Sequence, residues 1–144
     1  MAATSTLEDN KRLARQIPEA VATEGDLDRL DDICADDVVD RSPLGVVEGP
    51  AALKEQLAGV RVAFGEFSAT VEDIVAEGDT VAMRVTLRGT HRGEFMGAEA
   101  TGKAVEVQNM VFTRIEDGLI AERWVQPDTL GLMVQVGAVD PPVA

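Results

Sequence analysis

Residues 103–126 read KAVEVQNMVFTRIEDGLIAERWVQ. Apolar and polar residues alternate on both sides of Asp117-Gly118, a pattern typical of two half-buried β-strands. A short turn that contains glycine joins neighbouring strands as an antiparallel hairpin. The stretch therefore predicts strands over Lys103–Arg114 and Leu119–Gln126, and this hairpin decides the class of fold.

The same alternation begins upstream, near residue 66, where it replaces a helical period. Glu77-Gly78-Asp79 marks the turn of an earlier hairpin, and Gly89–Gly102 is a longer connection to the later one. The two earlier strands are predicted over Phe67–Ala76 and Thr80–Arg88. Strands joined in this order predict an antiparallel meander.

Helix signals flank the strands. Ser5-x-x-Glu8 has the form of a capping box, and Pro18 predicts a kink in the helix that follows, because proline removes a hydrogen bond. The predicted helices cover about residues 6–22, 27–34, 50–64 and 129–136, with a short extended piece at 36–41. Helices followed by a meander predict an α+β fold, with a curved antiparallel sheet wrapped on the N-terminal helices.

The chain has 144 residues, of which 45% are apolar, so we expect a single domain over residues 1–144 with loose tails at 1–5 and 138–144. No apolar run approaches the roughly 18 residues of a membrane span. The first residues show neither a basic start nor an apolar stretch, so we expect a cytoplasmic protein. With one cysteine, Cys34, and one histidine, His91, we expect no metal site and no cofactor.

The charge is strongly negative, because 26 acidic residues stand against 13 basic ones. Such a surface repels nucleic acids and anionic membranes, so we expect neither as a partner. The composition favours a protein adapted to a high-salt cytoplasm, where screening weakens self-repulsion. An acidic protein from an ordinary cytoplasm is the alternative.

Three segments resemble a known family when their order and spacing are taken together. They are Arg88–Gly97, Arg114–Trp124 and Asp128–Gly137. Together they resemble the SnoaL-like polyketide cyclases, a family of predicted ester cyclases. The resemblance implies the cone-shaped α+β fold of the nuclear transport factor two superfamily, in which a curved sheet and helices enclose an apolar pocket, often in a homodimer.

The resemblance also implies where acid/base groups would lie. Characterised members use an aspartate on the last strand, assisted by a histidine on the preceding strand, to close a ring by an aldol step. Counted from the Asp117-Gly118 turn, the histidine position falls on Val111 and the aspartate position on Val125. Neither valine can transfer a proton, so the family's usual acid/base pair is absent.

Strand parity extends the predicted pocket, because alternate residues face the same side of a sheet. If Val111 and Val125 face the pocket, their neighbours of equal parity face it too. The predicted pocket residues are Met83, Val85, Leu87, Asn109, Val111, Thr113, Arg123 and Val125. This lining suits a small apolar ligand that is uncharged or anionic.

Three residues could replace the missing acid/base pair. Asp128 is the nearest carboxylate in sequence, but an aspartate before a helical run is also a common helix cap. His91 is either a general base or a structural hydrogen-bonding residue. Arg123 could bind a carboxylate or enolate oxygen, or it could pair with a neighbouring glutamate.

Two functional hypotheses follow. The first is a cyclase, isomerase or hydrolase that acts on an apolar carbonyl or ester compound. The second is a non-catalytic domain that binds a ligand or forms a dimeric interaction module. We also expect a homodimer built through the outer face of the sheet, which carries Arg84, Thr86 and Arg88.

Overall fold

The computed structural model describes residues 6–142. Its first helix, α1 (Leu7–Gln16), begins at a capping box. The Asp9 backbone N–H donates to Thr6 Oγ1, and the Thr6 N–H donates back to the Asp9 carboxylate. The box therefore lies one residue later than the predicted Ser5-x-x-Glu8 box, and Ser5 lies outside the described residues.

Pro18 changes the type of the helix. α1 gives way directly to η1 (Ile17–Thr23), which is π-helical and carries Pro18 in its first turn. A proline cannot donate the hydrogen bond that an α-helix requires, and a wider turn accommodates the gap. Thr23 then fixes the end of η1 to the sheet, because its hydroxyl donates to the Pro18 carbonyl and accepts from the Ala69 N–H.

The remaining helices are short, apart from α3. The predicted helix 27–34 is a 3₁₀ turn, η2 (Leu27–Arg29), followed by α2 (Leu30–Ile33), and Cys34 already begins a strand. The other two are α3 (Pro50–Ala63) and α4 (Thr129–Gln135), close to their predicted ranges. Among the described residues, no helix is both long and apolar enough to cross a membrane.

The sheet has six strands in the order β2-β1-β6-β5-β4-β3. They are β1 (Cys34–Ser42), β2 (Gly45–Glu48), β3 (Phe64–Glu77), β4 (Thr80–His91), β5 (Ala104–Glu116) and β6 (Leu119–Pro127). The four predicted strands are β3 to β6, and they pair as an antiparallel meander. The N-terminal hairpin of β1 and β2 was not predicted beyond an extended piece at 36–41.

One pairing departs from the expected antiparallel sheet. β1 lies parallel to β6, with Asp40 opposite Arg123. The sheet is therefore mixed, because the hairpin from the first half of the chain joins the free edge of the last strand. This pairing brings together residues that lie 83 positions apart in the sequence.

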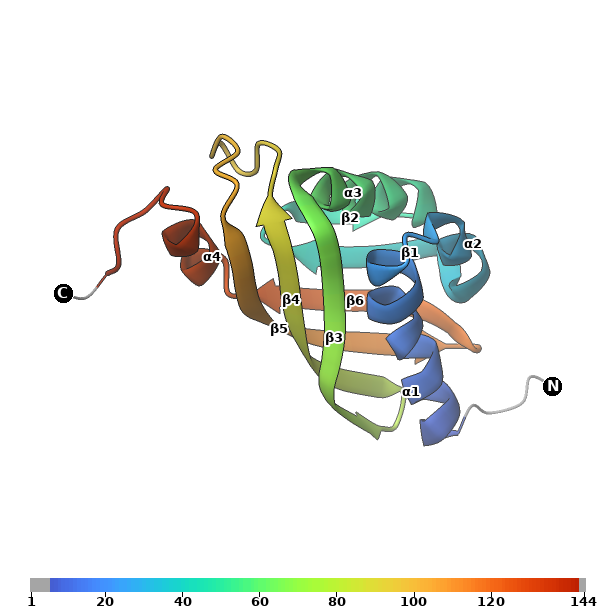
Figure 1. Ribbon diagram of the computed structural model, residues 1–144. Coiled ribbons are helices and arrows are strands. Elements are labelled where there is room, and N and C mark those ends of the chain that lie inside the picture. Colours follow the sequence, from blue (N-terminus) through green and yellow to red (C-terminus); the bar gives the residue numbers. More distant parts are fainter. Residues whose placement is uncertain (1–5, 143–144) are drawn as a thin grey trace.

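The sheet is curved, and the helices cover it unevenly (Figure 1). α1 and α2 lie together near one end of the sheet, whereas α4 lies beside β5 at the other end. Alternation along β5 separates two faces, since Asn109, Val111 and Thr113 are buried while Met110 and Phe112 are exposed. The buried face packs against the helices and positions the cavity described next.

Candidate active-site cavity

A cavity of about 150 Å³ lies between the buried face of the sheet and the helices η1, α3 and α4. Seven of the eight predicted pocket residues line it, and Thr113 does not. Thr113 is fully buried beside Arg123, its partner across the β5–β6 pairing. The role of all eight residues in binding a ligand remains a prediction.

Most of the cavity wall is apolar, with Ile17, Leu57, Phe64 and Leu132 added by the helices and the start of β3. These side chains come from elements that are distant in sequence, so alternation along strands does not reveal them. Leu44 and Met96 also line the cavity but are largely exposed, which places the opening between the β1–β2 turn and the β4–β5 connection.

A carboxylate and a guanidinium form a buried ion pair in this wall. Arg123 Nη1 lies 2.6 Å from Asp40 Oδ2, and their side chains are only 7% and 2% exposed. The parallel pairing of β1 with β6 sets the two residues opposite each other. Together the two groups have no net charge, and buried charges are tolerated when they are paired in this way.

Sequence analysis did not single out Asp40. It lies in a run with Asp36 and Asp37, which are not buried. Asp40 shares strand parity with the buried Val38, and this alternation is the signal that could have found it. Its partner, however, could be found only from the order of the strands.

Some polar atoms at the site lack partners. Arg123 Nε, Asn109 Oδ1 and Thr113 Oγ1 are buried, and within residues 6–142 none of them has a hydrogen-bond partner. Buried polar groups in folded proteins are nearly always satisfied. Arg123 and Asn109 line the cavity with other atoms, because these three atoms have almost no accessible surface.

The other two acid/base candidates are not among the residues that line the cavity. The Gly131 N–H donates to Asp128 Oδ1 at 2.8 Å, so Asp128 caps α4. His91 is fully buried, with Nδ1 3.1 Å from Thr101 Oγ1 and its ring stacked on Phe64. Of the three candidates, only Arg123 is among the residues that line the cavity.

The family model of the SnoaL-like polyketide cyclases matches residues 12–136 of the chain. The chain belongs to the SnoaL-like polyketide cyclase family. Aklanonic acid methyl ester cyclase DnrD from Streptomyces peucetius is 33% identical over 93 residues, which are 63% of each chain. The same enzyme from Streptomyces sp. strain C5, DauD, is also 33% identical, over 57% of its own length. The match thus spans less than two thirds of either relative.

Solved structures support the fold of this SnoaL-like protein. TsrD from Streptomyces laurentii has a TM-score of 0.86 at 29% identity, covering 94% of this chain and all of TsrD. AclR from Streptomyces galilaeus has a TM-score of 0.81 at 30% identity, covering 93% of this chain and 99% of AclR. The predicted fold, a curved sheet with helices in the SnoaL-like arrangement, is confirmed.

In this SnoaL-like protein, Val111 and Val125 are direct partners across β5 and β6, and both line the cavity. Two alkyl groups thus lie opposite each other. The pair of Thr113 and Arg123 lies two residues away on each strand. Within the described part of the chain, no group of three or more His, Cys, Asp or Glu residues could hold a metal ion.

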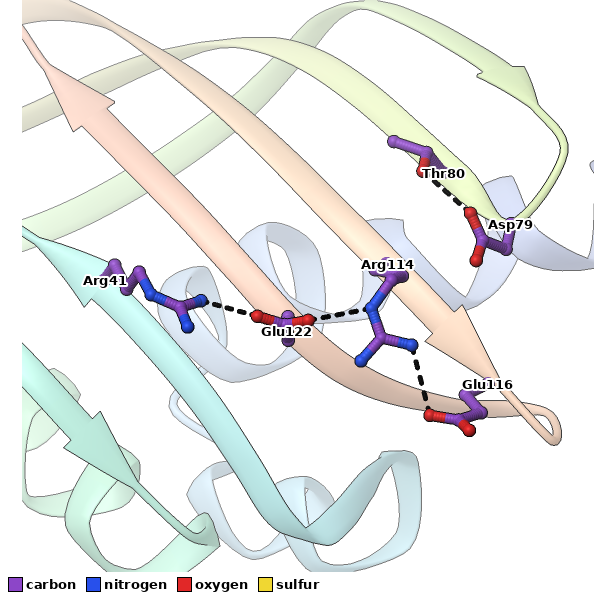
Figure 2. Close-up of polar contacts among 6 residues, drawn as sticks. All are labelled: Arg41, Asp79, Thr80, Arg114, Glu116 and Glu122. Atoms are coloured by element: carbon purple, nitrogen blue, oxygen red, sulfur yellow. Dashed lines mark hydrogen bonds and ion pairs between the residues drawn. The ribbon is translucent and has the colours of Figure 1, made fainter.

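On the outer face, a chain of ion pairs supports the strands that carry the cavity pair (Figure 2). Glu122 accepts hydrogen bonds from Arg41 at 2.7 Å and from Arg114 at 2.9 Å, which joins β6 to β1 and to β5. These bonds, first to Arg41 and then to Arg114, lower the pKa of Glu122. Arg41 and Glu122 are sequence neighbours of Asp40 and Arg123, so this network holds the two strands in register.

Proposed function

We propose that the protein is a small-molecule cyclase or isomerase that transfers a proton on an apolar carbonyl compound bound in the cavity. The observation that carries this proposal is the buried Asp40–Arg123 pair, because Asp40 is the one carboxylate among the residues that line the cavity. A carboxylate next to a fixed cation in an apolar site combines a base with a stabiliser of negative charge.

In the proposed step, Asp40 takes a proton from the carbon next to the carbonyl group. The ion pair uses Oδ2, so Oδ1 of Asp40 is left outside it. The electron pair of the broken C–H bond moves into the enolate, whose oxygen is stabilised by the Arg123 guanidinium. The enolate then attacks a second carbonyl group, giving a ring, or regains a proton at another carbon, giving an isomer.

The family supports the reaction class. DnrD and DauD are named as cyclases of aklanonic acid methyl ester, and an ester contains a carbonyl group. The valines at the family's expected acid/base positions cannot transfer a proton, so the same pair of residues cannot act here. Asp40 offers a base on a different strand. The alternative, a binding protein without catalysis, is favoured by the same two valines, Val111 and Val125.

Proton exchange tests the proposal without knowledge of the natural substrate. Acetophenone in D₂O exchanges the protons next to its carbonyl group, and NMR measures the rate. We expect acceleration by the natural protein and a loss of about 100-fold or more in Asp40→Asn, since a general base typically contributes that much. Asp128→Asn is the matched control, because Asp128 caps α4 instead of lining the cavity.

Equal exchange by the natural protein and Asp40→Asn would show that another group is the base. An absence of acceleration by the natural protein would favour the binding alternative. Circular dichroism confirms that each variant is folded.

A second experiment concerns the valines. The natural protein is expected not to cyclise aklanonic acid methyl ester, because Val125 has no lone pair to accept a proton. Val111→His combined with Val125→Asp places both groups on the cavity wall, and we expect turnover to appear. Robust turnover by the natural protein would contradict this prediction, and Asp40→Asn would then identify its base.

The proposed assembly is a homodimer formed through the outer face of the sheet. Phe112 and Trp124 pair across β5 and β6 on this face, and both are exposed. The expected contact residues Arg84 and Arg88 instead bind Asp73 and Glu106 within the chain. The apolar centre of the proposed interface is therefore Phe112 and Trp124. A cytoplasmic location and adaptation to high salt belong to the same proposal and rest on composition alone.

A further inference from the structure

The connection between β4 and β5 projects beyond the ends of both strands and has a fixed base (Figure 1). The Arg92 and Gly93 N–H groups both donate to the Ala63 carbonyl at the end of α3, at 2.9 and 3.0 Å. Just before β5 begins, the Gly102 N–H donates to the His91 carbonyl at 2.8 Å. Both ends of the connection are therefore held against the body of the fold.

The tip of this connection is a tight turn that contains an unfavourable residue. Phe95 and Ala98 exchange two backbone hydrogen bonds of 2.9 Å. Between them, Met96 and Gly97 have φ angles of 48° and 83°, as in a type I′ turn. Glycine adopts a positive φ freely, whereas a residue with a long side chain is strained there. Asparagine and aspartate are the usual residues at the position that Met96 occupies.

The turn between β5 and β6 shows the usual solution in the same chain. Glu116 pairs with Leu119, and the two residues between them, Asp117 and Gly118, have φ angles of 52° and 76°. Asp117 is not among the residues that line the cavity, whereas Met96 is. Two turns of similar conformation thus carry a favoured aspartate away from the cavity lining and a strained methionine within it. Strain of this kind, where it coincides with a site, indicates a functional residue.

Met96 lies at the mouth of the cavity. It is 47% exposed and also lines the cavity, so it borders both the interior and the solvent. The neighbouring Phe95 packs edge-on against Phe64, with 5.0 Å between the ring centres, and this contact fixes the turn against the cavity wall. A methionine side chain is unbranched and flexible, so it can change rotamer while the backbone of the turn stays in place.

We propose that Met96 is a gate that determines the size of the compounds that enter the cavity. Its side chain narrows the opening, so a small compound passes easily and a larger one passes slowly. Asparagine or aspartate would suit the turn better but would leave the opening wide and polar. The inference rests on the proposed function only for the class of compound, a neutral apolar ketone.

The association rates of two ketones test the gate. The probes are 4-dimethylaminoacetophenone, which has one ring, and 6-propionyl-2-dimethylaminonaphthalene, which has two. The fluorescence of both compounds changes in apolar surroundings, so stopped-flow fluorescence measures their association rate constants. We expect Met96→Ala to raise the rate constant of the two-ring ketone about tenfold and that of the one-ring ketone by a smaller factor.

Met110→Ala is the matched control for this variant. Met110 is 48% exposed, nearly the same as Met96, but it lies on the outer face of β5 and does not line the cavity. The control should leave both rate constants unchanged. An excess of the one-ring ketone should displace the two-ring ketone from the natural protein, as expected if both occupy the same cavity.

Met96→Asn tests whether the turn is strained for the sake of the gate. Because asparagine tolerates a positive φ, we expect the melting temperature to rise by about 3 °C. The two-ring ketone should nevertheless enter faster than in the natural protein, as in Met96→Ala. Asp117→Asn is the matched control, since aspartate already suits the equivalent turn, and it should leave the melting temperature nearly unchanged. A purely structural role for Met96 predicts a lower melting temperature in Met96→Asn.

Three outcomes would overturn the proposal: equal association rates of the two-ring ketone in the natural protein and Met96→Ala, a lower melting temperature in Met96→Asn, or no binding of either ketone to any of these proteins. These measurements involve no turnover. If Met96 controls entry while Asp40→Asn leaves proton exchange unchanged, the catalytic role of Asp40 fails and the gate stands. If exchange depends on Asp40 but entry does not depend on Met96, the gate alone fails.

Discussion

At Asp40 and Arg123, two opposite charges are removed from water at a distance of 2.6 Å. The attraction between two buried charges offsets the free-energy cost of removing them from water only while both are present. The pair therefore keeps a carboxylate inside an apolar wall. It also makes the fold depend on both side chains at once.

Removing one partner should therefore cost more than removing both. Arg123→Met leaves the Asp40 carboxylate buried without a partner, and we expect it to lower the free energy of unfolding by about 3–5 kcal/mol. The double variant Asp40→Leu with Arg123→Met should recover much of this loss. Urea denaturation of the three proteins measures the effect, and a double variant less stable than Arg123→Met would contradict it.

Cys34 illustrates burial acting on a single group. The residue is buried at the start of β1, and loss of hydration raises the pKa of its thiol to about 11. At pH 8 only about one thiol in a thousand is then the reactive thiolate. We expect Cys34 to resist maleimide labelling at pH 8 in the folded protein and to react quickly in guanidinium chloride. Rapid labelling of the folded protein would argue against this burial.

At the scale of elements, the parallel pairing of β1 with β6 brings the charged residues of the cavity wall together. β1 contributes Asp40 to the cavity and Arg41 to the outer face, while β6 contributes Arg123 and Glu122 to the same two faces. One junction thus carries an ion pair on each side of the sheet. The outer pair is partly exposed to solvent, so it responds to pH and salt more readily than the inner pair.

The Glu122 carboxylate should make the stability of the fold depend on pH in the acidic range. Its pKa in the folded protein is lowered, so it stabilises the fold above the ordinary pKa of glutamate, about 4.3, and this contribution disappears as the pH falls through the lowered value. We expect Glu122→Gln to lower the melting temperature at pH 7 and to flatten its fall below pH about 4.3.

Glu116→Gln is the control for that variant, because Glu116 bonds to Arg114 at the more exposed end of the network. Its effect should be smaller than that of Glu122→Gln. If both variants follow the pH profile of the natural protein, Glu122 does not link the strands in solution. Thermal melts between pH 3 and pH 7 supply the measurement.

At the scale of the whole molecule, the outer face of the sheet leaves large apolar side chains in solvent. Phe112 is 54% exposed and Met110 is 48% exposed, both on β5. Trp124 lies beside them, with the Arg41 guanidinium 5.3 Å from the centre of its ring. We expect an exposed apolar patch of this kind to be an interaction surface.

The proposed dimer should therefore depend on this patch. We expect a dimer mass by light scattering and a shift to the monomer in Phe112→Glu, which places a charge in the proposed interface. Val62→Glu is the matched control, since Val62 is 77% exposed on α3, away from the patch. A monomer mass for the natural protein at several salt concentrations would rule out the interface.

Net charge acts on the molecule as a whole. With 26 acidic residues against 13 basic ones, repulsion should weaken the fold at low salt and decrease with screening. We expect the melting temperature to rise by about 4 °C or more between low salt and 1 M KCl. Potassium chloride is preferred because sulfate strengthens apolar burial by itself. An unchanged melting temperature would remove the high-salt interpretation.

The meander β3 to β6 and the buried face of β5 could be predicted from the sequence, whereas Thr86 of β4, expected on the outer face, is buried. Alternation of apolar and polar residues is local, and the short turns at Gly78 and Gly118 set which strands pair. Met83, Asn109, Arg123 and the two valines line the cavity, and their role in binding a ligand stays a prediction. The cap formed by Asp128 was predictable for the same reason, because it involves neighbours in the chain.

Which groups meet across the cavity depends on how distant strands and helices pack together. Asp40 joins Arg123 because the β1–β2 hairpin adds to the free edge of β6 in parallel, and no pattern within either strand specifies that edge. The helices likewise bring Ile17, Phe64 and Leu132 to one wall. Local periodicity fixes which way a side chain faces, whereas contacts between distant segments depend on how whole elements bury their apolar faces together.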